Sequence, residues 1–197
     1  MDATTQKTIS SLRNHFLVAM PSLTDSSFAR SVVYICEHSC EGAMGLIINQ
    51  QLDIPAKAIF DQLELDYKNQ YGNRLIFDGG PVQQDRGFIL HRTCKKTWES
   101  TVDIGEDISL TASKDILGDI AQGSGPEDSL ITLGYSSWSA GQLEDELKQN
   151  SWLTIPADSA IIFNTDCANR AEAAVSSIGI DLDMLSLDSG NAWPKHT

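Results

Sequence analysis

The sequence is short of basic residues. Of its 197 residues, 14 are Lys or Arg and 27 are Asp or Glu, which gives a formal net charge of −13. Nucleic-acid phosphates repel such a chain, and neutralising those phosphates supplies most non-specific affinity for DNA. Lys95-Lys96 is the only adjacent basic pair. The sequence therefore predicts no direct binding of DNA or RNA and no adsorption to an anionic membrane.

Long hydrophobic runs are also missing. No apolar segment approaches the ~20 residues needed to cross a bilayer, and residues 1–7 lack the charged-then-apolar pattern of a secretion signal. The four cysteines have no regular spacing, which is typical of reduced thiols; they are Cys36, Cys40, Cys94 and Cys167. We therefore expect a soluble, cytoplasmic protein that makes no contact with a membrane.

What is present indicates one ordinary globular domain. The 197 residues are close to the usual ~100–200 residues per domain. The hydrophobic content is 41%, with 7% aromatic residues, as in a folded protein rather than a disordered one. A chain of this length buries roughly 70% of its unfolded surface, so its core needs no disulfide or metal.

Strand patterns come in neighbouring runs before the first clear helix. Apolar and β-branched runs predict strands over residues 15–20, 31–37, 43–49, 75–77, 87–92, 108–111, 129–135, 152–155 and 160–163. Helices are predicted from Pro55 to Leu63, after a capping Ser113, over 140–149 behind a Ser139–Gln142 capping box, and over about 168–178. Hairpin-like runs of strands favour an α+β fold with an antiparallel or mixed sheet.

One predicted strand ends in side chains that can carry chemistry, namely Cys36, Glu37 and His38. If the strand continued to Cys40, alternation would place three metal-binding side chains on one face. A zinc site would need further ligands, and the sequence offers His91 and Cys94. However, C-x-H-x-C is not an established zinc spacing, and paired C-x-x-C motifs are missing. We therefore expect no metal and no cofactor, with Cys36 buried as an unreactive thiol.

A second candidate is the glycine pair Gly79-Gly80, which follows a predicted strand. Glycines permit positive φ and close backbone approach, so a ligand could lie against exposed N–H groups. The glycine spacing fits neither a P-loop nor a dinucleotide fingerprint. Arg86 could grip a carboxylate or phosphate. In so acidic a chain, an ion pair with Asp78 or Asp85 is the simpler expectation.

A third candidate is the strand–turn–helix segment that contains Tyr135 and Trp138. A nucleophile elbow requires G-x-S-x-G, but Trp138 occupies the position of the second glycine. We therefore expect Tyr135 and Trp138 to pack beneath the following helix. The carboxylates of that helix are expected on a solvated face; they are Glu144, Asp145 and Glu146.

Several blocks, taken together, resemble the AlgH/YqgE family of bacterial proteins. They are residues 14–21, 30–38 with 42–45, 79–82 with 86–91, Gly134-Tyr135 with Trp138 and 141–144, and Trp152-Leu153 with 179–181. The sequence departs from the family pattern at Ala171, where a tryptophan usually follows arginine, at Cys40, and at Asn191-Ala192 near the C-terminus.

The resemblance implies one AlgH-like domain over residues 1–197, with a core of about 14–185 and loose tails at 1–13 and 186–197. It implies an α+β fold in which a branched mixed or antiparallel sheet closes partly into a small barrel surrounded by helices. The family is commonly labelled as transcriptional regulators, and it has no established catalytic residues, cofactor or DNA-binding motif.

Two functions follow as hypotheses. The first is a non-enzymatic, AlgH-like transcriptional regulator that acts through unidentified protein partners and not by binding DNA; its oligomeric state stays open. The alternative is a small-molecule-binding or hydrolytic enzyme with a pocket between residues 36–38 and 79–91. The candidate pocket residues are Cys36, Glu37, His38, Gly79, Gly80, Arg86, His91, Tyr135 and Trp138.

Overall fold

Ten strands form one branched sheet in the part of the chain that this computed structural model describes, residues 11–23 and 27–186. The strands are β1 (His15–Ala19), β2 (Val32–Ser39), β3 (Gly42–Ile47), β4 (Gln51–Pro55), β5 (Leu75–Asp78), β6 (Val82–Arg92), β7 (Thr101–Asp103), β8 (Ile108–Thr111), β9 (Ser129–Ser139) and β10 (Trp152–Pro156). The main path has the hydrogen-bonded order β10-β1-β2-β3-β9-β6-β8-β7, while β5 joins β9 as a branch that carries β4. Only the β5–β9 pair is parallel among these strands.

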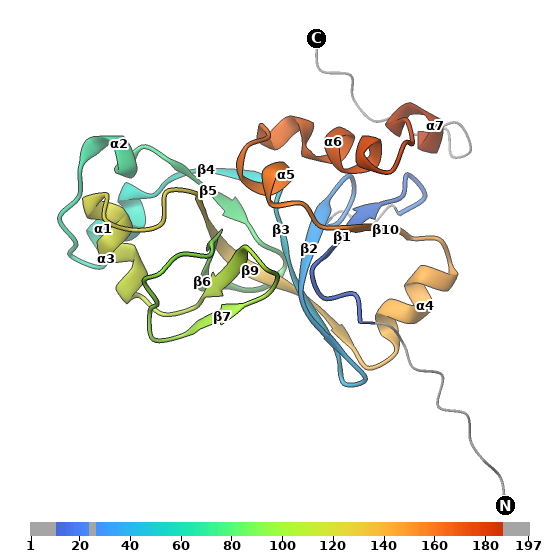
Figure 1. Ribbon diagram of the computed structural model, residues 1–197, viewed down its shortest axis with the longest axis horizontal. Coiled ribbons are helices and arrows are strands. Elements are labelled where there is room, and N and C mark those ends of the chain that lie inside the picture. Colours follow the sequence, from blue (N-terminus) through green and yellow to red (C-terminus); the bar gives the residue numbers. More distant parts are fainter. Residues whose placement is uncertain (1–10, 24–26, 187–197) are drawn as a thin grey trace, which may run out of the picture.

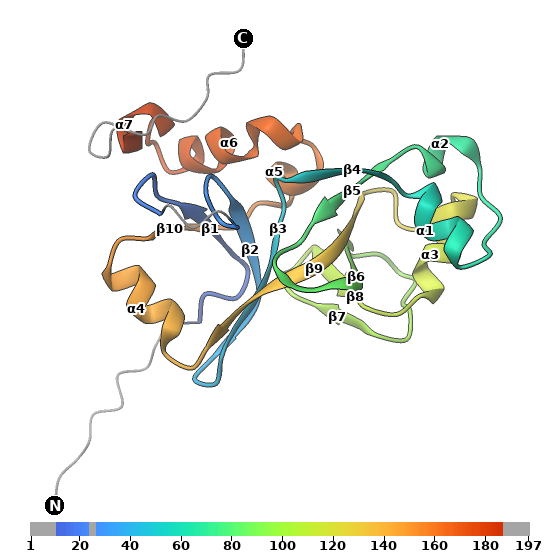
Figure 2. The same cartoon turned by 180° about the vertical axis from the view of Figure 1, so that it is seen from behind.

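Seven α-helices in the same described part surround the sheet. They are α1 (Lys57–Gln62), α2 (Asn69–Gly72), α3 (Asp115–Gln122), α4 (Gln142–Lys148), α5 (Ser159–Phe163), α6 (Arg170–Ser177) and α7 (Leu182–Ser186), with a 3₁₀ turn at Cys167–Asn169. In Figure 1, α1, α2 and α3 gather at one end, α4 lies at the other, and α6 and α7 run along one side. Figure 2 shows the same grouping from behind. No described helix is long and apolar enough to cross a bilayer.

The two halves of the sheet meet on β9. Its last residues pair with β3, and its first residues pair with β5 and β6. Gly134 has a φ of +73° near this change of partners. Register shifts in β2 after Ile35 and in β6 before Gly87 add local twist. The sheet therefore curls into a half-barrel, as its strands show in Figure 1.

Hydrophobic side chains form three clusters because both faces of the central strands are covered. On β2, Val32 and Tyr34 enter the central cluster, which includes side chains of α5 and α6, whereas Val33 and Ile35 enter a cluster with Leu143 of α4. This explains the continuous apolar run of β2, since a strand with one solvated face would alternate. The remaining cluster packs α1 and α3 against β5 and β6 through Phe60, Ile76, Ile89, Ile116 and Ile120.

The predicted α+β class with a mixed sheet is confirmed, and the strand expected over 108–111 has the same bounds as β8. The strand predicted over 160–163 is wrong, because these residues belong to α5. The carboxylate of Asp158 accepts the N–H of Ala160 at 2.8 Å and caps this helix, whose Ile161 and Ile162 enter the central cluster. The short elements β4, α2, β7 and α7 were not predicted.

The starts of three helices differ from the predictions. Pro55 is the last residue of β4 and does not open α1. Ser113 makes no cap on α3, since its hydroxyl donates to the Asp115 carboxylate. Half of the capping box at α4 is present: the Ser139 N–H donates to Oε1 of Gln142 at 3.1 Å, but no side chain caps the helix.

Residues 11–13, which the sequence assigned to a leading tail, are bonded to the sheet. The Ser11 hydroxyl donates to the His38 carbonyl at 3.1 Å, and the Leu12 N–H donates to Nδ1 of His38 at 2.9 Å. Arg13 donates through Nη2 to the carbonyl of Asp103 on β7. Ser186, expected in the trailing tail, is the last residue of α7. The rest of the two expected tails, residues 1–10 and 187–197, lies outside the described residues.

Candidate functional site

The candidate residues lie in different parts of the molecule. Cys36 is in the central cluster. Tyr135 was expected beneath α4, but this prediction is wrong, because its ring packs against the central cluster and meets Phe88. Trp138 is in the cluster beneath α4, and His91 contacts Trp98, which packs with α3. Two cavities formed by described residues, one beside Cys167 and one beside Tyr71, have none of the candidates in their linings. The structure therefore gives no support to a shared pocket between residues 36–38 and 79–91.

Cys36 is a buried thiol. It is 2% exposed, and its Sγ donates to the Tyr34 carbonyl at 3.7 Å. Burial raises the pKa of the Cys36 thiol far above its ordinary value, so the nucleophilic thiolate does not form at neutral pH. The neighbouring Glu37 lies where the β2 register shifts and is exposed. This part of the strand end is therefore structural.

Both ring nitrogens of His38 have partners within the chain. Nδ1 accepts the Leu12 N–H at 2.9 Å, and Nε2 lies 3.0 Å from Oε1 of Glu144. Because a backbone N–H can only donate, the neutral ring carries its proton on Nε2 and donates it to Glu144. The expectation of a solvated Glu144 is corrected here, since its side chain is only 19% exposed. His38 thus ties residues 11–12 and α4 to the end of β2.

Trp138 takes part in a second internal network beneath α4. Its Nε1 donates to Oε2 of Glu146 at 2.8 Å, and Nε1 of Trp152 donates to the same oxygen at 2.7 Å. The other carboxylate oxygen accepts Nε2 of Gln142 at 3.0 Å. Phe28 packs against both indole rings. Glu146 is therefore an internal acceptor as well, not part of a solvated face.

His91 lies against a threonine in a geometry that resembles a nucleophile and its base. Nε2 of His91 is 2.9 Å from the Thr111 hydroxyl, and Nδ1 is 3.0 Å from the Arg92 carbonyl. The carbonyl must accept, so Nδ1 carries the proton and Nε2 is free to accept from Thr111. However, the two residues are 1% and 0% exposed, and burial lowers the pKa of His91. No substrate reaches this pair, and its role is structural.

The glycine pair approaches the chain itself and not a ligand. A Cβ on Gly79 would lie 2.3 Å from the Gly134 carbonyl oxygen, and a Cβ on Gly80 would lie 2.4 Å from the Tyr135 carbonyl carbon. The N–H of Gly79 donates to the Leu133 carbonyl at 2.8 Å, and that of Gly80 donates to the adjacent Asp78 carboxylate at 3.0 Å. The N–H groups expected to face a ligand are therefore occupied.

Arg86 does not make the expected ion pair. Its guanidinium lies 5.0 Å from the centre of the Phe88 ring and donates to Oε1 of Gln83 at 3.5 Å. The Phe88 ring in turn meets Tyr135 edge-on, with 5.6 Å between ring centres. Arg86 thus reaches the central cluster through Phe88, and Tyr135 packs against the same cluster, which also contains Cys36.

The cysteines expected as free thiols are free in the structure. Cys40 and Cys94 are exposed, whereas Cys36 is buried and Cys167 is half-buried. Across the described residues, no group of three His, Cys, Asp or Glu side chains could hold a metal ion.

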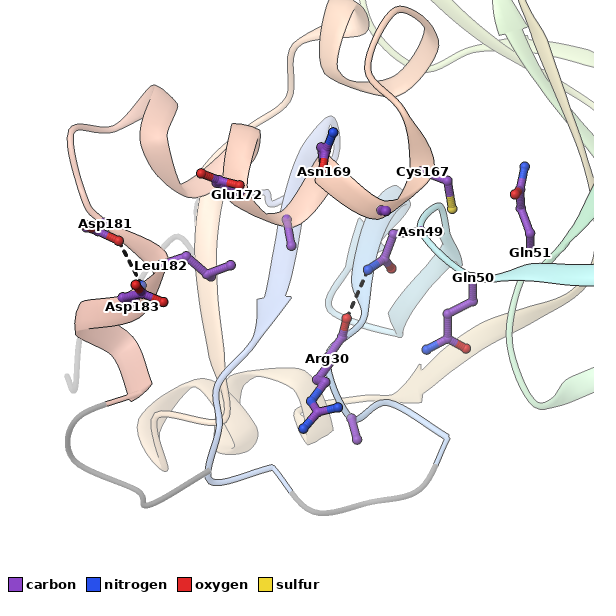
Figure 3. Close-up of a pocket in the computed structure, with 13 residues that line it drawn as sticks. Arg30, Asn49, Gln50, Gln51, Cys167, Asn169, Glu172, Asp181, Leu182 and Asp183 are labelled. Atoms are coloured by element: carbon purple, nitrogen blue, oxygen red, sulfur yellow. Dashed lines mark hydrogen bonds between the residues drawn. The ribbon is translucent and has the colours of Figure 1, made fainter. Parts of the chain in front are cut away.

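A cavity that the sequence did not reveal lies beside the C-terminal helices. This α6–α7 cavity has a volume of about 620 Å³ and is shown in Figure 3. Its lining residues are Ala29, Arg30, Asn49, Gln50, Gln51, Cys167, Ala168, Asn169, Ala171, Glu172, Asp181, Leu182 and Asp183. No single motif could have identified it, because the lining comes from three segments that are far apart in the sequence.

Two internal arrangements support this cavity. Asn49 accepts the Val32 N–H at 2.7 Å and donates to the Arg30 carbonyl at 2.9 Å, which holds Arg30 at its φ of +61°. Behind α6, the buried Arg170 donates to the carbonyls of Ile48 and Thr165 and lies over the Phe77 ring. Burial lowers the pKa of Arg170. These contacts join α6 to the link between β3 and β4.

Cys167 lies inside the α6–α7 cavity. Burial raises the pKa of the Cys167 thiol, and this effect outweighs the lowering by the Arg170 charge and by the backbone N–H of Gln51, which points to the sulfur. The thiol therefore stays protonated at neutral pH and serves as a weakly polar part of the lining.

The curled, branched sheet and the helices around it place this protein in the α+β fold class. The model of the AlgH-like family matches residues 16–183, which includes nearly all of the described structure. The chain belongs to this family, as the resemblance of its sequence blocks predicted.

Relatives and solved structures agree with this family. A UPF0301 protein of Saccharophagus degradans is 52% identical over 182 residues, covering 92% of this chain and 89% of that protein. A UPF0301 protein of Nitrosococcus oceani is 46% identical over 187 residues, covering 94% and 100%. The solution structure of the AlgH protein from Pseudomonas aeruginosa has a TM-score of 0.77 at 42% identity, covering 98% of this chain and 99% of that one. A Corynebacterium diphtheriae crystal structure has a TM-score of 0.69 at 20% identity, covering 90% and 92%, and supports the fold alone.

Proposed function

We propose that this chain is a non-enzymatic regulatory protein that acts by binding a protein partner and does not bind nucleic acid directly. A contrast between two sets of polar side chains supports the proposal. The groups suited to catalysis, Cys36, His38 and His91, are buried and bonded within the chain. The side-chain amides of Gln50 and Gln51, by contrast, line the α6–α7 cavity without a hydrogen bond to the described residues, so they can bind a partner.

The charge of the chain bears on the kind of partner. A net charge of −13 opposes association with phosphate backbones and favours encounter with a basic protein surface. The resemblance to a family labelled as transcriptional regulators supplies the regulatory context. If the chain regulates transcription without binding DNA, it must act on another protein that does bind DNA or the transcription machinery.

The proposal is tested with the purified full chain. Fluorescence anisotropy with a labelled DNA duplex, at low and physiological ionic strength, is expected to show no saturable binding by the chain alone. In parallel, proteins crosslinked to the chain in cells are purified singly and titrated against it by calorimetry. Saturable one-to-one binding of such a protein supports the proposal. Tight DNA binding without a second protein, or failure of every captured protein to bind, contradicts it.

A further inference from the structure

We infer that the α6–α7 cavity binds a short basic segment of the partner protein, with a lysine or arginine side chain inside the cavity and the main chain along β4. This inference rests on the proposed function, because it names the chemistry of the partner. Its support comes from the size of the cavity, the charge of its lining, its unbonded amides and the strand at its mouth.

The cavity is large enough for part of a peptide. Its volume of about 620 Å³ is within the ~300–1,000 Å³ range of small-ligand sites. One long side chain fills only part of that space, so the adjoining main chain can enter as well. The apolar portions of the lining, from Ala29, Ala168, Ala171 and Leu182, suit the aliphatic stem of a lysine or arginine.

The lining carries more negative than positive charge. Glu172, Asp181 and Asp183 contribute carboxylates, and Arg30 contributes the one guanidinium in the lining. In Figure 3, the Arg30 guanidinium points away from α6, whereas Glu172 and Asp181 lie on the helical side. Asp181 also caps α7, since it accepts the Asp183 N–H at 2.9 Å. Phosphate and carboxylate ligands are therefore disfavoured, and a cationic group is favoured.

The amide side chains match a peptide main chain. Within the described residues, the side chains of Gln50, Gln51 and Asn169 make no hydrogen bond with the rest of the chain, nor does the Glu172 carboxylate. Each amide offers donors and an acceptor, the same set of groups that a peptide unit presents. Glu172 is exposed and supplies the anionic partner for an incoming ammonium or guanidinium group.

The strand at the mouth of the cavity can bind an extended segment. Gln51 lines the cavity and is also the first residue of β4. Among the described strands, β4 pairs only with β5, and its register shifts between Gln51 and Pro55. An outer strand presents unpaired N–H and C=O groups, and peptides use such edges by adding a strand. The Gln51 N–H already points to the Cys167 sulfur, so the edge open to a peptide begins after Gln51. That part of β4 gives main-chain affinity, and the cavity selects the basic side chain.

The test uses NMR titration of the isotopically labelled full chain. The probe is the capped peptide Gly-Lys-Gly-Arg-Gly, and the matched control peptide replaces both basic residues with glutamate. We expect saturable shifts of the Gln50, Gln51 and Asn169 signals with the basic peptide alone, weakened by added salt. Equal shifts with both peptides, or shifts confined to another face, overturn the inference.

Variants separate specific binding from general attraction to an acidic chain. Glu172→Lys is expected to lower the affinity for the basic peptide at least about tenfold, which is ~1.4 kcal/mol. Ala168→Trp is expected to fill the cavity and block binding of the peptide. Asp85→Lys makes the same charge change on the exposed β6 segment, away from the cavity, and should alter affinity much less. Equal losses for Glu172→Lys and Asp85→Lys contradict a site in the cavity. Thermal unfolding of each variant confirms that it remains folded.

The inference and the proposed function can fail separately. If a reconstituted protein partner binds Glu172→Lys and Ala168→Trp as tightly as the unaltered chain, the partner uses another surface, and only the inference is wrong. If the peptide binds the cavity but no protein partner binds the chain, the inference about the cavity stands as a peptide site and the proposed function is wrong.

Discussion

Glu146 links two tryptophans to α4 through a single carboxylate. One of its oxygens accepts both indole N–H groups, at 2.8 and 2.7 Å, and the other accepts Gln142. Each buried donor left without an acceptor costs ~1–3 kcal/mol. We therefore predict that Glu146→Ala lowers the free energy of unfolding by about 2–4 kcal/mol, measured by urea denaturation followed by tryptophan fluorescence.

A neighbouring carboxylate is the matched control. Asp145 pairs with Lys148 on the exposed side of α4, where both side chains are mostly in water. Asp145→Ala should change stability little, because exposed ion pairs contribute little. Glu146→Gln retains one oxygen acceptor and should cost less than Glu146→Ala. Equal effects of Asp145→Ala and Glu146→Ala would show that the indole contacts do not carry stability.

His91 makes the stability of the protein depend on pH. Burial lowers the pKa of His91 in the folded state, so between that value and the unfolded pKa near ~6.5 the unfolded chain binds more protons. The contribution of the buried neutral ring is complete above the unfolded pKa and is lost as the pH falls. We predict that His91→Gln is less stable than the unaltered chain at pH 8, and that the difference narrows at pH 5.

Urea denaturation of both proteins at the two pH values measures this difference. The other histidines are the same in both proteins, so their effects cancel in the comparison. A difference in unfolding free energy that stays constant with pH would mean that His91 does not titrate differently in the folded and unfolded states.

At the scale of elements, the chain directly after β5 passes close to β9, and this close approach requires glycine. A Cβ on Gly79 would lie 2.3 Å from the Gly134 carbonyl oxygen, a contact between two main chains that cannot move independently. We predict that Gly79→Ala destabilises the protein by at least ~2 kcal/mol. Gly118, inside α3, is the control because a Cβ there meets nothing within 4 Å.

Gly118→Ala should therefore stabilise the protein by about 0.5–1 kcal/mol, the usual gain in a helix interior. The melting temperatures of the two variants should move in opposite directions. If both alanine variants stabilised the protein, the close approach at Gly79 would not constrain the sheet.

The elements also show where sequence patterns succeed. β2 and β8 have strong apolar patterns of ordinary strand length, and both were predicted. Residues 160–163 have an equally apolar pattern but form α5, because Asp158 caps the helix and the packing of Ile162 decides its conformation. Short apolar runs carry no period long enough to distinguish helix from strand. β4 and β7 were missed because exposed outer strands have weak patterns.

At the scale of the whole molecule, the environments of the four cysteines differ. Cys40 and Cys94 are exposed, Cys167 is half-buried in the α6–α7 cavity, and Cys36 is buried. Burial raises the pKa of both Cys36 and Cys167, which reduces their thiolate fraction further. We predict fast reaction of Cys40 and Cys94 with a disulfide reagent, slow reaction of Cys167, and reaction of Cys36 only after unfolding.

Mass spectrometry of the labelled peptides identifies each thiol over time. The basic peptide used above should slow the labelling of Cys167 without affecting Cys94, which serves as the internal control. Labelling of Cys36 in the folded chain as fast as Cys40 would contradict its burial in the central cluster.

The sequence by itself determined the fold class, the family and the charge of this protein. Apolar periodicity, the blocks of residues and composition are local or additive properties, so they can be read along the chain. Only the tertiary structure decided the use of the polar side chains. Folding buries Cys36 and places His38 against Glu144 and His91 against Thr111, partners that are distant in sequence. These side chains are therefore structural, although their residue types are suited to catalysis. The α6–α7 cavity forms because folding brings together three segments that are far apart in the sequence. A local sequence pattern cannot predict such a contact.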